Sequence, residues 1–279
     1  MRHLHVASAS VSALEREARK YGISCIVLLA TYFPLKGTGV HNGDLLERIK
    51  GHPLFQAFGS LDVMNNPQGG LFELASLAGE GKIKGIKLYP GYQGFEPGDE
   101  RLDEVYALAE RYGLPVMLHG GELQICCPPE QLENGPRPCG FATCKLRQYE
   151  DMSRPAFVER PAREHPRVKF VVSHLGNPHF DELRGLMNRC PNVYTDISGQ
   201  FISGSSEDTE EYRQFIVAEI RRFLACPRGH ERVIFATDFP IQSYADSLDL
   251  VARLKLNKPE EANMLFYNAW RVLDPTHLP

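Results

Sequence analysis

Two histidines separated by a single leucine lie near the start of the sequence, in the stretch Arg2-His3-Leu4-His5-Val6. Side chains alternate between the two faces of a strand, so His3 and His5 would point to the same side of a strand formed there. Neutral imidazoles are frequent ligands of Zn²⁺ and similar divalent ions. These five residues could equally belong to a frayed, basic chain terminus. A metal site therefore needs further ligands from other parts of the chain.

Three further residues of ligand type end short apolar runs. His119 ends VMLH, His174 ends FVVSH and Asp238 ends VIFATD. A single histidine at such a place is more often a hydrogen-bonded structural residue than a ligand. Several separate runs that end in this way favour a shared site, and imidazoles with one carboxylate suit Zn²⁺ or a similar ion.

Short apolar runs recur along the chain, with helical patterns between them. The eight runs cover residues 3–6, 25–30, 55–61, 83–90, 115–120, 168–176, 192–198 and 232–240. This alternation predicts parallel strands covered by helices. Eight such units fit an α/β fold of the (β/α)8 (TIM) barrel type, which typically has about 250 residues. A doubly wound open sheet is the main alternative, but no GxGxxG follows the first run.

Start and stop signals mark the helices between these runs. Ser12-Ala-Leu-Glu15 is a capping-box pattern that predicts a helix start, and Gly22 predicts its end. The stretch 100–113 has the apolar spacing of an amphipathic helix and stops at Gly113.

In a barrel the carboxyl ends of all strands meet at one mouth, so polar residues far apart in sequence can converge there.

We predict a single barrel domain over residues 1–279, with a long Cys/Pro-rich loop at about 120–153. Loops of this length in a compact domain are usually functional. Four thiols in the loop could hold a structural zinc ion, but their spacing is not that of a standard zinc knuckle, so free thiols are preferred. They are Cys126, Cys127, Cys139 and Cys144.

With these residues in place, the chain resembles the amidohydrolase superfamily, specifically its amidohydrolase-related (amidohydrolase 2) branch of metal-dependent hydrolases. This branch also contains non-oxidative decarboxylases. The resemblance extends over nearly the whole chain. It rests on HLH, GIKLYPGYQGF, DERLDEVYALAERYGLPVMLHGG, FVVSHLG, NVYTDISG, IFATDFP and NAWRVL, in that order.

The resemblance implies a set of ligands for one divalent ion, with Zn²⁺ as the expected metal. His3, His5, His119 and Asp238 would surround it, and His174 would bind a second ion or hold the attacking water or the substrate. A divalent ion lowers the pKa of bound water toward ~7. Asp238 would take the proton of that water and pass it to the leaving group, which is general acid–base catalysis.

Lys87 is a further candidate. Some superfamily members carry a carboxylated lysine on this strand that bridges two ions, so a second ion is expected if Lys87 is carboxylated. A lysine before Leu88-Tyr89-Pro90 also suits binding of a substrate carboxylate, and both alternatives stay open. Asp196 and Ser198, at the end of the seventh run, are expected to support the site through hydrogen bonds.

The expected function is hydrolysis of a small ester, lactone or amide by a metal-activated water. The first alternative is a lyase, a metal-dependent decarboxylase of a small unsaturated or aromatic acid. The second is a catalytically impaired barrel without a complete metal site. It arises because the family usually has an acidic residue two positions before the first histidine, where this chain has Met1.

The charge and composition of the chain limit the classes of partner and the cell compartment that we expect. A net charge of −4 and a pI of about 6.2 give no reason to expect nucleic acid or a membrane surface. No stretch approaches the ~20 consecutive apolar residues of a transmembrane helix. An odd number of cysteines, seven, fits a reducing cytoplasm better than a disulfide framework. We therefore expect a cytoplasmic protein with a small-molecule substrate, and self-association into a homo-oligomer stays open.

Overall fold

The computed structural model describes residues 10–124 and 145–274. Its seven parallel strands follow one another in sequence order within one sheet, and each pairs with the next. They are β1 (Ile26–Leu29), β2 (Phe55–Gly59), β3 (Gly85–Leu88), β4 (Val116–Leu118), β5 (Phe170–Val172), β6 (Val193–Asp196) and β7 (Val233–Ile234). Each of the seven apolar runs after the first contains one of these strands, which confirms those predictions. The first run, 3–6, lies outside the described residues.

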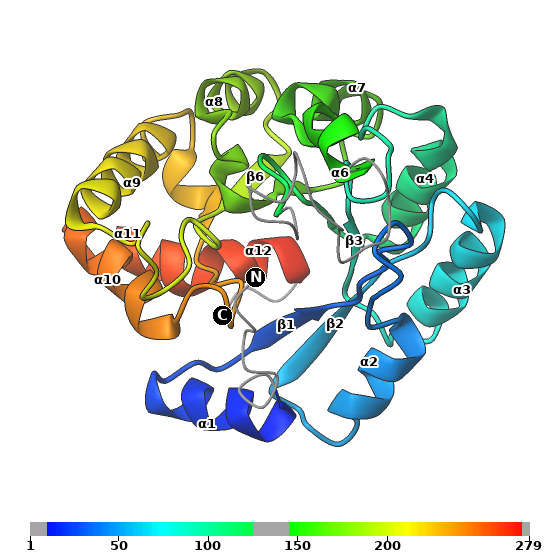
Figure 1. The fold of residues 1–279 in the computed structure, drawn as a ribbon, viewed down its shortest axis with the longest axis horizontal. Helices are drawn as coiled ribbons and strands as arrows, with labels where there is room; N and C mark the ends of the chain where they lie inside the picture. The colour runs from blue at the N-terminus through cyan, green and yellow to red at the C-terminus, as the bar shows by residue number, and fades with distance from the viewer. Residues whose placement is uncertain (1–9, 125–144, 275–279) are drawn as a thin grey trace, which may run out of the picture.

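Helices surround the sheet (Figure 1). They are α1 (Val11–Lys20), α2 (Asn42–Ile49), α3 (Pro67–Gly79), α4 (Asp103–Tyr112), α6 (Lys145–Gln148), α7 (Glu159–Glu164), α8 (Phe180–Arg189), α9 (Glu210–Leu224), α10 (Tyr244–Leu254), α11 (Lys258–Ala262) and α12 (Asn268–Leu273). Single turns also occur at Glu100–Leu102, Glu150–Ser153, Pro155–Val158, Ser173–Gly176, Gly229–Glu231 and Asn263–Tyr267. None of the helices in the described ranges combines the length and hydropathy that crossing a bilayer requires.

The predicted start of the first helix was wrong by two residues. Ser10, and not Ser12, is the N-cap, because its Oγ accepts the main-chain N–H of Ala13 at 3.2 Å. Both serines are suitable N-cap residues, and only the backbone geometry separates them. The predicted ends are confirmed: Gly22 follows α1 with φ +68°, and Gly113 caps α4 with φ +65°, a conformation that glycine adopts without strain.

Helix α12 packs at the amino ends of the strands. The side-chain amide of Asn268 donates to the carbonyls of His230 (2.9 Å) and Val233 (2.7 Å), at the start of β7. Lys169, just before β5, donates to the carbonyl of Arg271 in α12. Since all the strands are parallel, their carboxyl ends, which carry the polar residues, lie at the end of the sheet opposite α12.

The sheet curls without a described pairing between its two edge strands. β1 pairs with β2, and β7 pairs with β6, within the described part of the chain. All four residues of β1 are half-buried, whereas all four residues of β3 are buried. The structure thus confirms an α/β fold with a curled seven-stranded parallel sheet. A complete eight-stranded barrel stays a prediction, because it needs one more strand between β7 and β1.

Candidate active site

A lysine occupies a buried position on β3. Lys87 is 2% exposed, and its Nζ donates to Ser173 Oγ at 3.0 Å and lies 5.2 Å from the ring centroid of Tyr89. Within the described residues it forms no ion pair. Burial lowers the pKa of Lys87 to about 8, against the opposing attraction of Asp196 and Asp238. Position 87 therefore holds a desolvated amine that is influenced by the charges of two carboxylates of the site.

His119 follows β4 and is also buried. Its Nε2 lies 3.1 Å from the carbonyl oxygen of Glu122; because a carbonyl only accepts, Nε2 carries the hydrogen and Nδ1 keeps the lone pair. The ring meets those of Tyr92 and His174 edge-on, with centroids 4.8 and 5.1 Å away. Burial lowers the pKa of His119 well below its usual value, and charges on His174 and Lys87 act in the same direction. The imidazole is neutral, the form that binds metals.

His174 follows β5 in a left-handed backbone conformation, with φ +63°. Its main-chain N–H donates to Asp196 Oδ1 at 3.1 Å, and its Nδ1 lies 2.9 Å from Ser198 Oγ and 3.1 Å from the Ser198 carbonyl oxygen. The carbonyl again requires a donor, so Nδ1 carries a hydrogen, and in the neutral imidazole Nε2 then keeps the lone pair. Ser198 in turn donates both its N–H (3.0 Å) and its hydroxyl to Asp196 Oδ1. Asp196 and Ser198 thus hold His174 in one orientation.

Asp238 follows β7 with φ +56°. Asp238 is an exposed residue, yet the surrounding protein desolvates its carboxylate and raises its pKa, while the positive charges of protonated His174 and of Lys87 oppose the rise. A Cβ built on Gly199 (φ +60°) would lie 2.7 Å from His174 Nδ1 and 3.3 Å from Asp238 Oδ2. His174 and Asp238 therefore converge on the same glycine, which has to lack a side chain.

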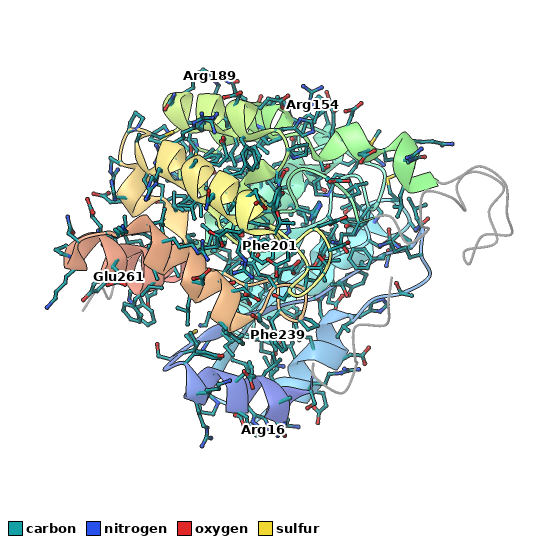
Figure 2. The ribbon with its side chains drawn as sticks, turned by 60° about the vertical axis from the view of Figure 1, so that its left-hand side comes forward. Arg16, Arg154, Arg189, Phe201, Phe239 and Glu261 are labelled. Atoms are coloured by element: carbon teal, nitrogen blue, oxygen red, sulfur yellow. The ribbon has the colours of Figure 1, made fainter. Side chains whose placement is uncertain are left out.

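The loops after β6 and β7 lie against each other at this end of the sheet. The main-chain N–H of Ser203 donates to the carbonyl of Ile241 at 3.0 Å. Figure 2 shows Phe201 and Phe239 in these inner loops, whereas Arg16, Arg189 and Glu261 lie on the surrounding helices. The two loops form one wall of the candidate site.

The structure brings together all six of the predicted site residues that it describes. Lys87, His119, His174 and Asp238 face one region, with Asp196 and Ser198 behind His174. His3, His5 and the four loop cysteines lie outside the described residues, so their roles stay predictions. Within 10–124 and 145–274, no three His, Cys, Asp or Glu side chains are close enough to hold an ion. A metal site would need further donors.

The described residues fit a divalent cation in their chemistry. His119 Nδ1 and the Asp238 carboxylate are lone-pair donors of the kind that Zn²⁺ and Mn²⁺ accept. With Asp196 and Asp238 ionised and Lys87 protonated, the site carries one net negative charge, which a cation would neutralise. Asp196 Oδ2 is also buried without a hydrogen-bond partner among the described residues.

An aromatic wall beside His119 was not predicted. The ring centroid of Phe33 lies 4.8 Å from that of Tyr89 and 5.2 Å from that of Tyr92. Lys36 Nζ lies 4.6 Å from the Tyr92 centroid and donates to the carbonyl of Gln124 at 3.3 Å. Aromatic residues in Gly/Pro-rich segments directly after a strand, as in TYFPLKG and LYPGY, are the sequence signal that could have indicated this wall.

Comparison with solved structures finds the same fold in several proteins. An uncharacterized TIM-barrel protein from Bordetella bronchiseptica has a TM-score of 0.69 and 19% identity, over 96% of this chain and 83% of that chain. A probable 2-pyrone-4,6-dicarboxylic acid hydrolase from Acinetobacter baumannii has a TM-score of 0.66 and 15% identity, over 95% and 89%. A dihydroxybenzoic acid decarboxylase from Polaromonas sp. JS666, with bound manganese and the inhibitor 2-nitroresorcinol, has a TM-score of 0.65 and 15% identity, over 96% and 87%. At these identities the likeness shows the fold alone.

Comparison at the level of sequence gives the family. A search of curated proteins finds no match to this chain. A family model described as amidohydrolase matches residues 36–274, which include Lys87, His119, His174, Asp196, Ser198 and Asp238. Since that match spans most of its length, this chain belongs to the amidohydrolase family.

Proposed function

We propose that this chain is a divalent-metal-dependent hydrolase that cleaves a small ester, lactone or amide carrying a carboxylate group. The observation that carries the proposal is the convergence of Asp238 and His174 on Gly199, beside the buried amine of Lys87. This arrangement offers a base, an orienting imidazole and a cation within one site. Each of these groups can assist hydrolysis of a polarised carbonyl, by taking a proton, orienting the water or stabilising negative charge.

The residues have distinct roles in this reaction. His3, His5, His119 and Asp238 would hold the ion, which when bound supplies a Lewis acid and lowers the pKa of water. Asp238 accepts the proton of the attacking water and delivers it to the leaving group, and its raised pKa makes it a better base than an ordinary aspartate. His174, held by Ser198 through Nδ1–H, accepts a hydrogen bond from the same water at Nε2.

The charge of the site supports an anionic substrate. A divalent ion, two ionised carboxylates (Asp196 and Asp238) and protonated Lys87 sum to one net positive charge. A buried ammonium without an ion pair gains more from a carboxylate than an exposed one does, because the surrounding dielectric is low. The hydrolase from Acinetobacter baumannii and the decarboxylase from Polaromonas are both named for carboxylic acids.

Decarboxylation is the second candidate. It exchanges CO₂ for a proton at carbon, and it therefore needs a proton donor that works near neutral pH. Lys87, with a pKa lowered to about 8, has this property. The Polaromonas neighbour is named as a decarboxylase and contains manganese.

The two reactions differ in their products. The full chain, loaded with Mn²⁺ or Zn²⁺, is incubated in H₂¹⁸O with ring lactones, esters and aromatic acids that carry a carboxylate. Hydrolysis is expected to place ¹⁸O in the product without release of CO₂. Release of CO₂ without ¹⁸O in the organic product would replace the proposal by the second candidate, and absence of turnover by metal-loaded protein would contradict both.

Asp238→Asn tests the assigned base. We expect turnover to fall by about 10²- to 10⁴-fold, because an amide cannot accept the proton of water. Asp44→Asn, at an exposed position in the first turn of α2, is the matched control and should keep full activity. Metal content is measured in both variants, so that loss of the ion is distinguished from loss of the base. Near-normal turnover by Asp238→Asn would exclude Asp238 from the mechanism.

A further inference from the structure

A buried glutamine joins the loops that follow β5, β6 and β7. Gln200 is 4% exposed, and its Nε2 donates to the carbonyl of Ser198 at 2.9 Å. Its Oε1 accepts from Asn177 Nδ2 at 3.2 Å, and its main-chain N–H donates to Gln242 Oε1 at 2.9 Å. One residue of the β6 loop thereby contacts the loops on both sides.

Each of these loops carries a residue of the candidate site. Asn177 lies three residues after His174, and its main-chain N–H donates to the His174 carbonyl at 3.0 Å. Gln242 lies four residues after Asp238, whose carbonyl accepts the N–H of Ile241 at 2.9 Å. Gln200 therefore links the segment that holds His174 to the segment that holds Asp238.

The carbonyl of Ser198 is shared between two donors. A carbonyl oxygen has two lone pairs; His174 Nδ1–H and Gln200 Nε2–H both point to this one, at 3.1 and 2.9 Å. The direction of the carbonyl, and with it the orientation of the imidazole, is thus set in part by Gln200. Among the described residues, the hydrogen bonds of Gln200 go to Asn177, Ser198 and Gln242, and not to His174 or Asp238 themselves.

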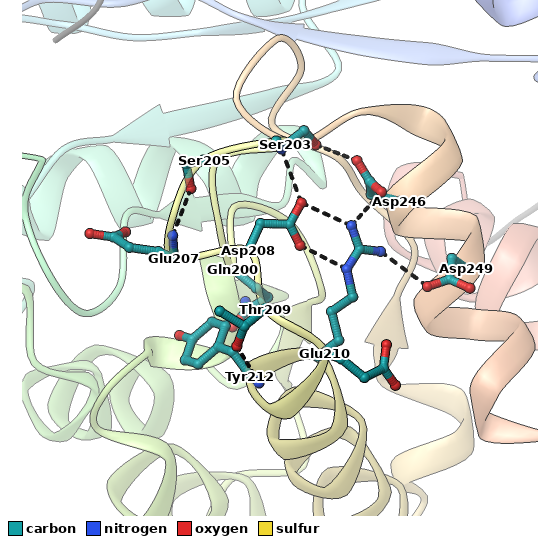
Figure 3. Close-up of polar contacts among 12 residues, drawn as sticks. Gln200, Ser203, Ser205, Glu207, Asp208, Thr209, Glu210, Tyr212, Asp246 and Asp249 are labelled. Carbon is teal, nitrogen blue, oxygen red and sulfur yellow. Dashed lines mark hydrogen bonds and ion pairs between the residues drawn. The ribbon is translucent and has the colours of Figure 1, made fainter.

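The loop that carries Gln200 is anchored at its far end. Arg213 on α9 pairs with Asp208 at 2.7 Å in the same loop, and with Asp246 at 2.6 Å and Asp249 at 3.0 Å on α10. Ser203 also donates to Asp246, and Figure 3 shows these contacts around the turn between Gln200 and α9. Because the loop is fixed to two helices, Gln200 can impose its geometry on the residues it contacts.

We propose that Gln200 is a positioning residue that fixes the tautomer and orientation of His174 relative to Asp238. The catalytic meaning of this role rests on the proposed function, whereas its effect on the His174 ring does not depend on any substrate. A glutamine that only filled space between the loops would leave the ring unaffected when its hydrogen bond to Ser198 is removed.

Gln200→Glu removes one interaction at nearly constant volume. The carboxylate still accepts from Asn177 but presents an oxygen, and no donor, to the Ser198 carbonyl. Gln242→Glu is the matched control, since Gln242 is also buried and the variant keeps the acceptor for the Gln200 N–H. Of the hydrogen bonds made within the described part of the chain, it loses the donor to Ser247 Oγ (2.8 Å), which is not one of the site residues. Gln200→Met, which introduces no charge, replaces Gln200→Glu if the latter does not fold.

The main readout is the ring ¹⁵N–¹H NMR spectrum of the histidines in the full chain, with His174→Gln to assign the signals. We expect His174 of the unmodified protein and of Gln242→Glu to be in the Nδ1–H form. In Gln200→Glu we expect a mixture of both tautomers. On a substrate found in the assay above, kcat should fall about tenfold more in Gln200→Glu than in Gln242→Glu, with KM nearly unchanged.

The outcomes separate the two proposals. Identical His174 spectra in Gln200→Glu and Gln242→Glu would overturn the positioning role, whatever the activity. Altered spectra in Gln200→Glu alone would support it, even if the protein proved to catalyse decarboxylation or the hydrolase proposal failed. Equal losses of kcat in both variants would also contradict it, because a general loss of packing would then explain the effect.

Discussion

Gly199→Ala introduces a single methyl group at the point where His174 and Asp238 meet. The new Cβ would lie 2.7 Å from His174 Nδ1, which is roughly 0.7 Å short of ordinary van der Waals contact. The ring cannot retreat without weakening its hydrogen bonds to Ser198. Asp238 Oδ2, at 3.3 Å from the same Cβ, would also be crowded.

Gly199→Ala destabilises the protein in two ways, through backbone strain and through the close contact of the new Cβ. The same substitution at a second glycine separates these two effects. Gly199 has φ +60°, and a residue with a side chain in this conformation costs about 1–2 kcal/mol. Gly204, in the same loop, has φ +72° but nothing within 4 Å of its added Cβ. Gly204→Ala therefore bears the backbone cost without the contact. For a chain of this size that cost lowers Tm by roughly 2–8 °C.

The function of the site should respond only to Gly199→Ala. A displacement approaching ~1 Å in an active site can reduce the rate about 100-fold, so we expect kcat to fall about 10- to 100-fold in this variant and to stay within about twofold in Gly204→Ala. Thermal unfolding and turnover are measured on both proteins with the same metal. Equal activity of the two variants would refute the inferred approach of His174 and Asp238 to Gly199.

Two further variants test the amine and the imidazole of the site. Lys87 has a pKa of about 8 in the folded chain and 10.5 ordinarily, so the unfolded state binds more protons between these values and stability rises with pH there. We measure the free energy of unfolding by urea for chelator-treated protein and for Lys87→Met. From pH 8.5 to 9.5 the difference between the two proteins should rise by about 1 kcal/mol per pH unit. Parallel pH dependences of the two proteins would contradict the lowered pKa. His119→Ala should lower both the bound metal and the Tm gain on metal addition, as measured by elemental analysis and calorimetry; unchanged metal content would remove His119 from the ligands.

The course of the strands could be predicted because it depends on local patterns. Runs such as VMLH and FVVSH are apolar over several residues, and burial between helices requires such runs. The strand ends could not be predicted as well. β7 contains only Val233 and Ile234, whereas the predicted run covers residues 232–240, and the chain has left the sheet before Asp238, which has φ +56°.

The geometry of the site depends on contacts that no local pattern encodes. Lys87 and Ser173 are hydrogen-bonded across 86 positions of sequence, and Gln200 and Gln242 across 42. The left-handed backbone of His174 and Asp238 is uncommon outside glycine, and the residue types alone do not predict it although Asp and His adopt it more often than most. The residue types of the site were therefore visible in sequence, whereas their orientations and their supporting hydrogen bonds were not.

A manganese anomalous-difference map from crystals of the full chain tests the common site most directly. We expect one strong peak at the carboxyl ends of the strands, in contact with His119 Nδ1 and the Asp238 carboxylate and completed by His3 and His5. A peak bound by other residues, or none at saturating Mn²⁺ with His119 and Asp238 ordered, would contradict the metal-dependent mechanism.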